Sequence, residues 1–503
     1  MSRADHAFAF LTKLFKASVL PVLVFVCSAI ACFIANATTV ASYAAGQEPG
    51  DTPPALRAPI QQLYSLTAAV DTSLRNFPTL RYAKARVMQT RAGITLARTA
   101  YLPNFDLLFQ ELRTTTNVIA GAIFPQTLDV IPMQTGAEKR GSSFNSVFAN
   151  NTGANFSWEL WDFGLRHANV NLAKTDYAAA NAQVRLTDLD VAAAAAEAYL
   201  QTVAAKQTIR AQKATVKRME AWALIVHTLV DKGLRPGVDA ARADADLSFA
   251  RIALIEAERE TELARVDLSE SMGLAGNYIG IDDAPWIKRP SNMFNAQVVD
   301  LALHPYAVLR TAEVKTAGAQ VQVLNKTYYP HIWFHSAIWG RGSGVRNNVL
   351  SPVADGAVPQ VANWVAGFSM SFPAADIFKI RAQKRMAIQN EQARRANYDL
   401  AIQVLTQKDA RAKILLDNAR RIADETPVLI KAAKENEIKA LERYRVGLST
   451  IVEVAEAERI LARAEVEDAV AEVRVWRSIL ATAYAQGNLS PFMSLVASAE
   501  GGK

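Results

Sequence analysis

An internal duplication constrains this chain more than any other feature of its sequence. Pro78 recurs as Pro305 at an offset of 227 residues, and Gly233 recurs as Gly447 at an offset of 214. A repeat of this length is a duplication of a domain-sized unit rather than a solenoid repeat. The change in offset means that one segment, at about residues 111–150, is longer in the first copy. We therefore expect two equivalent halves whose main difference is a surface loop.

Each copy contains a very long helical segment. Residues 165–229 include neither Gly nor Pro and are rich in strong helix formers. A helix of this length would measure about 100 Å, longer than most globular domains. The glycines and proline of residues 231–237 then favour a turn. We expect helical hairpins at about 165–272 and 380–484.

Between the short and long helices, each copy has segments in which apolar and polar residues alternate, the pattern of a two-faced strand. The expected strands are about 104–114, 151–161, 331–340 and 363–373. Strands of about 9–11 residues are long enough to cross an outer membrane when tilted; the alternative is a soluble sheet with one face on a core. The candidate lipid-facing residues are Phe105, Leu107, Phe156, Trp158, Leu160, Phe368, Met370 and Phe372.

Four strands cannot close a barrel, and lipid does not tolerate an open sheet edge. If the strands span a membrane, several chains must therefore close the barrel together. Two chains would provide eight strands and an interior filled by side chains, whereas three would provide twelve strands and a lumen. A trimer is the more economical arrangement.

The N-terminal segment has the layout of a secretory signal. Basic residues precede the apolar run Ala17–Ile34, and the small residues at 35–37 match an A-x-A cleavage site. We expect a signal peptide at 1–37 and a flexible linker at 38–59; a retained anchor is the alternative. Both cysteines lie in the leader. The box ending at Cys32 resembles a lipoprotein signal only loosely, because Ala29 stands where leucine is usual, so lipidation is not the preferred interpretation.

Composition excludes some classes of protein. The formal charge is +7, and acidic residues are interleaved with the basic ones. Nucleic-acid binding requires clustered Lys and Arg, so none is expected. His331 and His335 share a strand face without a third local ligand, and no nucleophile or phosphate-binding motif stands out. We expect no enzymatic activity, no cofactor and no metal site.

An ordered set of motifs resembles the TolC family of outer-membrane efflux proteins. The set comprises the duplicated plan, Tyr101-Leu102-Pro103, Tyr328-Tyr329-Pro330, the segment Leu160-Trp161-Asp162-Phe163-Gly164 and the segment 444–454. The resemblance implies a mainly helical chain with membrane β-strands and a first repeat at 60–285, a second at 286–487 and a C-terminal tail at 488–503. It also implies a homotrimer whose twelve-stranded β-barrel in the outer membrane continues into a periplasmic α-helical barrel.

The same resemblance implies an exit duct for a tripartite efflux pump or a type I secretion system. Its partners would be a periplasmic adaptor, an inner-membrane transporter and outer-membrane lipid. The alternative is a periplasmic coiled-coil scaffold or adaptor without a pore. The longer loop at 111–150 would lie outside the cell. The sequence does not indicate the substrate, because the inner partner selects it.

The resemblance also assigns residues at the hairpin tips. Glu453 and Glu456 match two acidic residues that narrow the periplasmic entrance, and their spacing places them on one helix face. Rings of like charge would select cations and raise the pKa of each carboxylate. Asp239 and Tyr444 match a latch, but Ser449 stands where the family has an arginine, and Arg445 is one candidate substitute. The turns with Gly233, Leu234, Gly447 and Leu448 would contact the adaptor.

Overall fold

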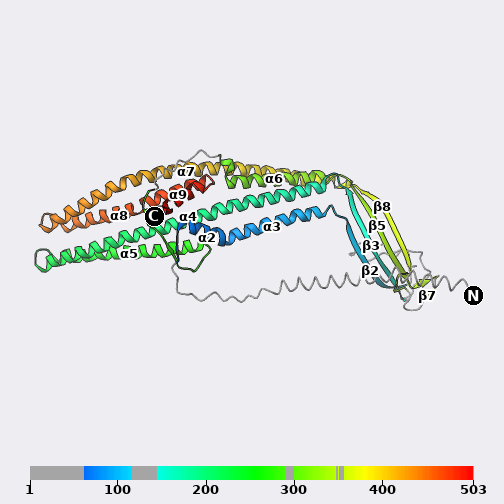
Figure 1. Ribbon diagram of the computed structural model, residues 1–503, viewed down its shortest axis with the longest axis horizontal. Coiled ribbons are helices and arrows are strands. Elements are labelled where there is room, and N and C mark those ends of the chain that lie inside the picture. Colours follow the sequence, from blue (N-terminus) through cyan, green and yellow to red (C-terminus); the bar gives the residue numbers. More distant parts are fainter. Residues whose placement is uncertain are drawn as a thin grey trace, which may run out of the picture. The chain divides into compact units, whose positions relative to one another are not determined.

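The computed structural model describes residues 62–115, 144, 146–289, 300–346, 349–350 and 356–501. The expected signal peptide, the linker, Cys32 and the middle of the 111–150 loop lie outside these residues. The elements of the described part follow one another along the chain as Figure 1 shows. They are β1 (Gln62–Tyr64), α2 (Leu66–Asn76), α3 (Pro78–Thr99), β2 (Asn104–Thr115), β3 (Ser146–Trp161), α4 (Leu165–Asp231), α5 (Gly237–Ser271), β4 (Ile279–Ile281), η1 (Ala284–Ile287), η2 (Leu301–Leu303), α6 (Pro305–Lys326), β5 (His331–Ser343), β6 (Val345–Arg346), β7 (Val349–Leu350), β8 (Val361–Ser371), η3 (Ala374–Asp376), α7 (Ile377–Arg445), α8 (Ile451–Ala485) and α9 (Ser490–Gly501).

The two copies produce helices of matched length. Helices α3 and α6 each contain 22 residues and begin at the repeated prolines, Pro78 and Pro305. Proline suits the first position of a helix because its missing N–H would have no intrahelical partner there. Helices α5 and α8 each contain 35 residues. The repeated residues thus begin equivalent elements in both halves.

Two long helical hairpins make up most of the chain. Helix α4 has 67 residues and packs against α5, while α7 has 69 residues and packs against α8. Helix α4 also packs against α8, so the two hairpins are in contact. Figure 1 shows each hairpin turning at the end farthest from the labelled strands β2, β3, β5 and β8. None of the described helices is both long and apolar enough to cross a membrane.

Strands β2, β3, β5 and β8 form one antiparallel sheet in that order. Strand β3 begins at Ser146, earlier than the expected residue 151. In the register, Phe105 lies opposite Phe156, while Phe334 lies between Trp158 and Phe368. Opposite residues of an antiparallel pair share a face. Most of the candidate lipid-facing residues therefore lie on one face of the sheet: Phe105, Leu107, Phe156, Trp158, Phe368 and Met370.

The other two candidates lie at irregular positions. Leu160 lies at a register shift between Glu159 and Trp161. Phe372 follows the last residue of β8, and its ring centroid is 5.3 Å from that of Tyr328. Both side chains are at least partly exposed, as Phe105, Leu107, Phe368 and Met370 are. The opposite face carries mostly polar or small residues, among them the row Ser157, His335 and Gly367.

A tight turn joins β3 to α4. Gly164 has φ +92°, a conformation that glycine adopts without strain, and its N–H donates to the Asp162 carboxylate at 3.0 Å. The Arg166 guanidinium donates to the same carboxylate at 3.1 Å and to the Glu159 carbonyl at 2.7 Å. The segment 160–164 is therefore a hydrogen-bonded strand-to-helix junction.

The largest buried cluster lies midway along the hairpins. Trp286 lies between Tyr199 and Trp476, with ring centroids 6.0 and 5.1 Å away. Residues 488–503, expected as a tail, include helix α9, whose Phe492 and Val496 are fully buried in this cluster. Glu500 of α9 also accepts the Leu66 N–H at 2.8 Å, at the start of α2.

Candidate functional site at the hairpin tips

The two hairpin tips have the same backbone geometry. Gly233 has φ +71° and Gly447 has φ +82°, so each occupies the left-handed conformation that ends many helices. The Gly233 N–H donates to the Val230 carbonyl at 2.8 Å, and the Leu234 N–H to the Leu229 carbonyl at 2.9 Å. This is a Schellman cap, and it positions Leu234 at the tip with its side chain 66% exposed.

The second tip repeats this pattern bond for bond. The Gly447 N–H donates to the Tyr444 carbonyl at 3.1 Å, and the Leu448 N–H donates to the Arg443 carbonyl at 2.8 Å. Leu448 is 70% exposed. Both tips therefore present one exposed leucine on a rigid turn, which is a suitable anchor for a partner protein.

Tyr444 and Asp239 link the two tips. The Tyr444 hydroxyl donates to the Asp239 carboxylate at 2.8 Å, although Asp239 belongs to α5 and Tyr444 to α7. Tyr444 is fully buried, and the Trp222 ring packs edge-on against it with centroids 5.0 Å apart. Burial and the hydrogen bond to Asp239 raise the pKa of Tyr444 to about 12. The hydroxyl therefore keeps its proton, and the donor, at any physiological pH.

Arg235 supplies a guanidinium that the sequence did not point to. Its carbon Cζ lies 4.2 Å from the Tyr444 ring centroid, and its Nη2 donates to the Tyr444 carbonyl. Arg445 is exposed. Ser449 is buried, and its hydroxyl donates to the Ala440 carbonyl at 3.3 Å. The arginine at this link thus comes from the first tip.

The repeat itself could have identified Arg235. At the offset of 214 residues that relates the tips, Arg235 is the counterpart of Ser449, and Asp239 is the counterpart of Glu453. The arginine that is missing from the second copy is therefore present at the equivalent position of the first. Each tip carries one half of the charged and aromatic groups.

Glu453 and Glu456 are both exposed near the start of α8. Glu453 accepts a long hydrogen bond, 3.5 Å, from the Thr450 hydroxyl. Arg459 holds Glu456 through two hydrogen bonds of 2.6 and 2.9 Å and thereby lowers the pKa of the carboxyl. Within one chain this direction is opposite to the rise expected for a bare carboxylate ring, because Arg459 neutralises Glu456.

A buried ionic cluster joins the hairpins behind the tips. Arg218 of α4 approaches Glu465 at 2.8 Å and Glu458 at 3.5 Å, both on α8. Burial raises the pKa of Glu458 to about 7, Arg218 acts in the opposite direction, and the neighbouring Glu437 carboxylate adds to the rise. The sequence did not single out these residues, because Glu and Arg are common on long helices.

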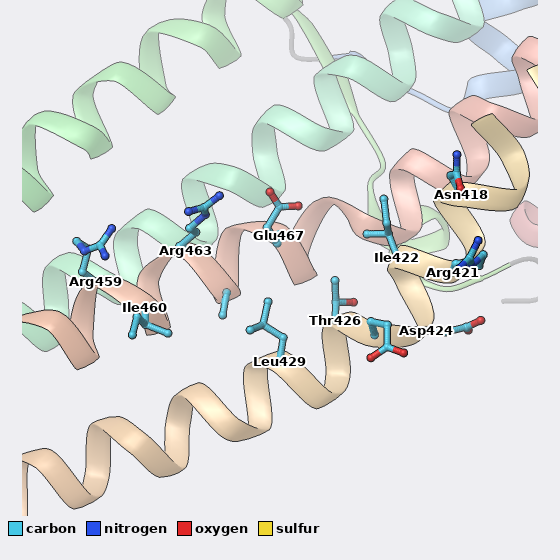
Figure 2. Close-up of a pocket in the computed structure, with 12 residues that line it drawn as sticks. Asn418, Arg421, Ile422, Asp424, Thr426, Leu429, Arg459, Ile460, Arg463 and Glu467 are labelled. Carbon is cyan, nitrogen blue, oxygen red and sulfur yellow. The ribbon is translucent and has the colours of Figure 1, made fainter. Parts of the chain in front are cut away.

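Two grooves run beside these residues. One lies between α4, α5 and α8 and has a volume of about 590 Å³. The other lies between α7 and α8 and has a volume of about 990 Å³. Figure 2 shows Leu429 of α7 and Ile460 of α8 projecting toward each other in this second groove.

The described residues give no sign of a metal site, since no cluster of three or more His, Cys, Asp or Glu side chains occurs among them. His331 contacts the Glu159 carboxylate at 2.5 Å, and His335 contacts the Ser369 hydroxyl at 2.9 Å. These partners account for both histidines within the sheet.

Comparison with known proteins gives consistent matches. The chain is 24% identical over 281 residues to protein CyaE of Bordetella pertussis, covering 53% of each chain, so the match spans about half the length of that relative. Among solved structures, CusC matches with a TM-score of 0.70 and 15% identity, covering 88% of this chain and 99% of that one. The MtrE outer membrane channel of Neisseria gonorrhoeae, in its open state, matches with a TM-score of 0.65 and 19% identity, covering 88% and 98%.

The structural matches establish the fold, and the family match covers most of the sequence. The family model for outer membrane efflux proteins matches residues 69–274 and 309–478, one segment in each copy of the duplication. The chain belongs to the outer membrane efflux protein family.

Proposed function

We propose that the chain is the outer-membrane exit duct of a tripartite efflux pump or a type I secretion system. It would conduct substrates passively from a periplasmic pump complex to the exterior. Three chains would close a twelve-stranded barrel, because the four-stranded sheet of one chain has two free edges and lipid does not tolerate them. A periplasmic adaptor would dock at the tips, where Leu234 and Leu448 are exposed.

The observation that carries the proposal is the exposed apolar face of the sheet. Phe105, Phe368 and Met370 are 64%, 73% and 70% exposed in the single chain. Large apolar side chains gathered on one exposed face mark an interaction with lipid or another protein. A periplasmic scaffold without a pore would not need such a face next to two helical hairpins, so that alternative is less well supported.

The proposal is tested by reconstituting the purified full-length protein in planar lipid bilayers. We expect discrete single-channel currents. In cells, deletion of the gene should raise ethidium accumulation if the duct serves a pump, or abolish release of a secreted protein if it serves type I secretion. Absence of channels in bilayers and of both defects in cells would contradict the proposal.

Glu453 and Glu456 are proposed to form the carboxylate rings of the periplasmic gate. Replacing both with Gln should lower the cation selectivity of the single channel, measured as reversal potential in a salt gradient. Because Arg459 neutralises Glu456, we expect Glu453→Gln alone to cause most of the loss. Unchanged selectivity in the double variant would remove the rings from the account.

A further inference from the structure

The groove between α4, α5 and α8 has the dimensions of a ligand site. Its volume of about 590 Å³ falls within the range typical of pockets for small organic molecules. Met219 and Trp222 of α4, Phe249 of α5 and Val452 of α8 provide apolar surface. One chain supplies all three helices, so the site does not depend on the proposed duct.

Two buried polar atoms in this groove have no hydrogen-bond partner. They are the indole nitrogen Nε1 of Trp222, whose side chain is 3% exposed, and the carboxylate oxygen Oδ2 of Asp246. Leaving a buried polar group unpaired costs about 1–3 kcal/mol, so native structures rarely keep one without a reason. One of these atoms is a donor and the other is an acceptor. An occupant that satisfies both must offer an acceptor beside a donor.

The charges around the groove favour a cationic donor. The lining carboxylates of α8 already have arginine partners: Glu456 pairs with Arg459, Glu458 with Arg218 and Glu467 with Arg474. Asp246 forms no ion pair within the described residues. Burial raises the pKa of Asp246, partly offset by Arg242, which means that its ionised form lacks compensation. A cation placed against Asp246 would supply it.

The exposed arginines of the groove do not make it an anion site. Figure 2 shows that Arg459 and Arg463 extend from α8, the helix shared with the second groove, which they also line. Arg242 and Arg463 are exposed. An anion held there would leave the Asp246 oxygen without a partner and would stand next to a fourth carboxylate.

We propose that this groove binds an amphipathic organic amine that carries an oxygen atom close to its ammonium group. The ammonium pairs with Asp246, the oxygen accepts the Trp222 N–H, and the apolar body lies against Met219 and Phe249. Because the Trp222 ring packs edge-on against Tyr444, a bound amine also contacts a member of the link between the tips.

The test uses two probes with the same aromatic body and opposite charge. Propranolol carries a naphthyloxy group, a hydroxyl and an ammonium, whereas naphthyloxyacetate carries the same group and a carboxylate. Isothermal titration calorimetry on the full-length protein, with the detergent blank subtracted, should show saturable binding of propranolol and much weaker binding of naphthyloxyacetate. This comparison needs no variant.

Variants then locate the site. Asp246→Asn keeps the shape and removes the charge, so propranolol affinity should fall about tenfold or more, as expected for a charged hydrogen bond. Trp222→Phe should weaken binding by a smaller factor. Asp244→Asn is the matched control, because Asp244 is exposed on the same helix, pairs with His227 and does not line the groove.

Three results would overturn the proposal. They are equal binding of the two probes, propranolol binding that Asp246→Asn leaves unchanged, and the absence of saturable propranolol binding to the wild-type protein. Equal weakening by Asp244→Asn and Asp246→Asn would show a general charge effect and would also count against the site.

Discussion

Replacing Arg235 tests what holds the two hairpin tips together at the residue scale. Arg235→Gln removes both the cation–π contact and the hydrogen bond to Tyr444, which together stabilise the contact by about 1–3 kcal/mol. If the closed duct depends on this link, the variant should show larger or more frequent single-channel openings. Arg445→Gln is the control, since Arg445 is exposed on the neighbouring turn. Identical currents in the two variants would exclude Arg235 from the gate.

The ionic cluster behind the tips makes a prediction about pH. The pKa of Glu458 is raised to about 7 from an ordinary 4.5. Its protonated form therefore favours the folded state, and this contribution is complete below about pH 4.5 and is lost as the pH rises through 7. The shift corresponds to on the order of 3 kcal/mol.

The measurement is the apparent melting temperature of the full-length protein between pH 5 and 8. The wild-type value should fall toward pH 8 more steeply than that of Glu458→Gln. Glu256→Gln, at an exposed position of α5, should keep the wild-type slope. Parallel curves for wild type and Glu458→Gln would show that this carboxyl does not control the pH dependence.

Residues at the tips were predictable only where a local motif marks them. The turn glycines and the pair Tyr444 and Asp239 follow from the segment 444–454 and from the repeat. Trp222 and Glu458 did not stand out, because their roles arise from contacts between helices; Arg218 and Glu458, for example, are 240 positions apart. Nothing in a helical pattern shows which of many arginines meets which glutamate.

At the scale of elements, the alternation along the strands makes a directional prediction. Phe368→Lys places a charge on the apolar face of β8 and should impair outer-membrane assembly by about 2–4 kcal/mol if that residue lies near the bilayer midplane. Ser369→Lys is the matched control, because the next residue of a strand points to the opposite face. The measurement is the fraction of assembled protein in outer membranes. Equal loss in both variants would argue against a lipid-facing surface.

Element types followed from the sequence wherever the period was clear. The strands were predictable because apolar and polar residues alternate with period two, and the long helices because Gly and Pro are absent over 65 residues. Helix α9 was missed because Phe492 and Val496 are too few to show a period. Its burial depends on the cluster around Trp286 and Trp476, which only the folded chain assembles.

At the scale of the whole molecule, the free edges of β2 and β8 predict how chains associate. In a closed barrel, β2 of one chain must pair with β8 of the next, because these strands form the two edges of the sheet. Both native cysteines lie in the leader, so engineered cysteines can report on this pairing. Asp106→Cys on β2 would be combined in turn with Asn363→Cys, Val365→Cys and Gly367→Cys on β8.

With a short bismaleimide cross-linker, at least one of these pairs should give bands that end at three chains on a denaturing gel. Asn155→Cys with Ala337→Cys is the control: these residues are opposite each other on β3 and β5, so the link stays within one chain and adds no mass. Three chains supply the twelve strands that leave a lumen, whereas two would supply eight and an interior filled by side chains. A ladder that stops at two chains, or continues past three, would therefore contradict a conducting trimer even if each chain folds as described.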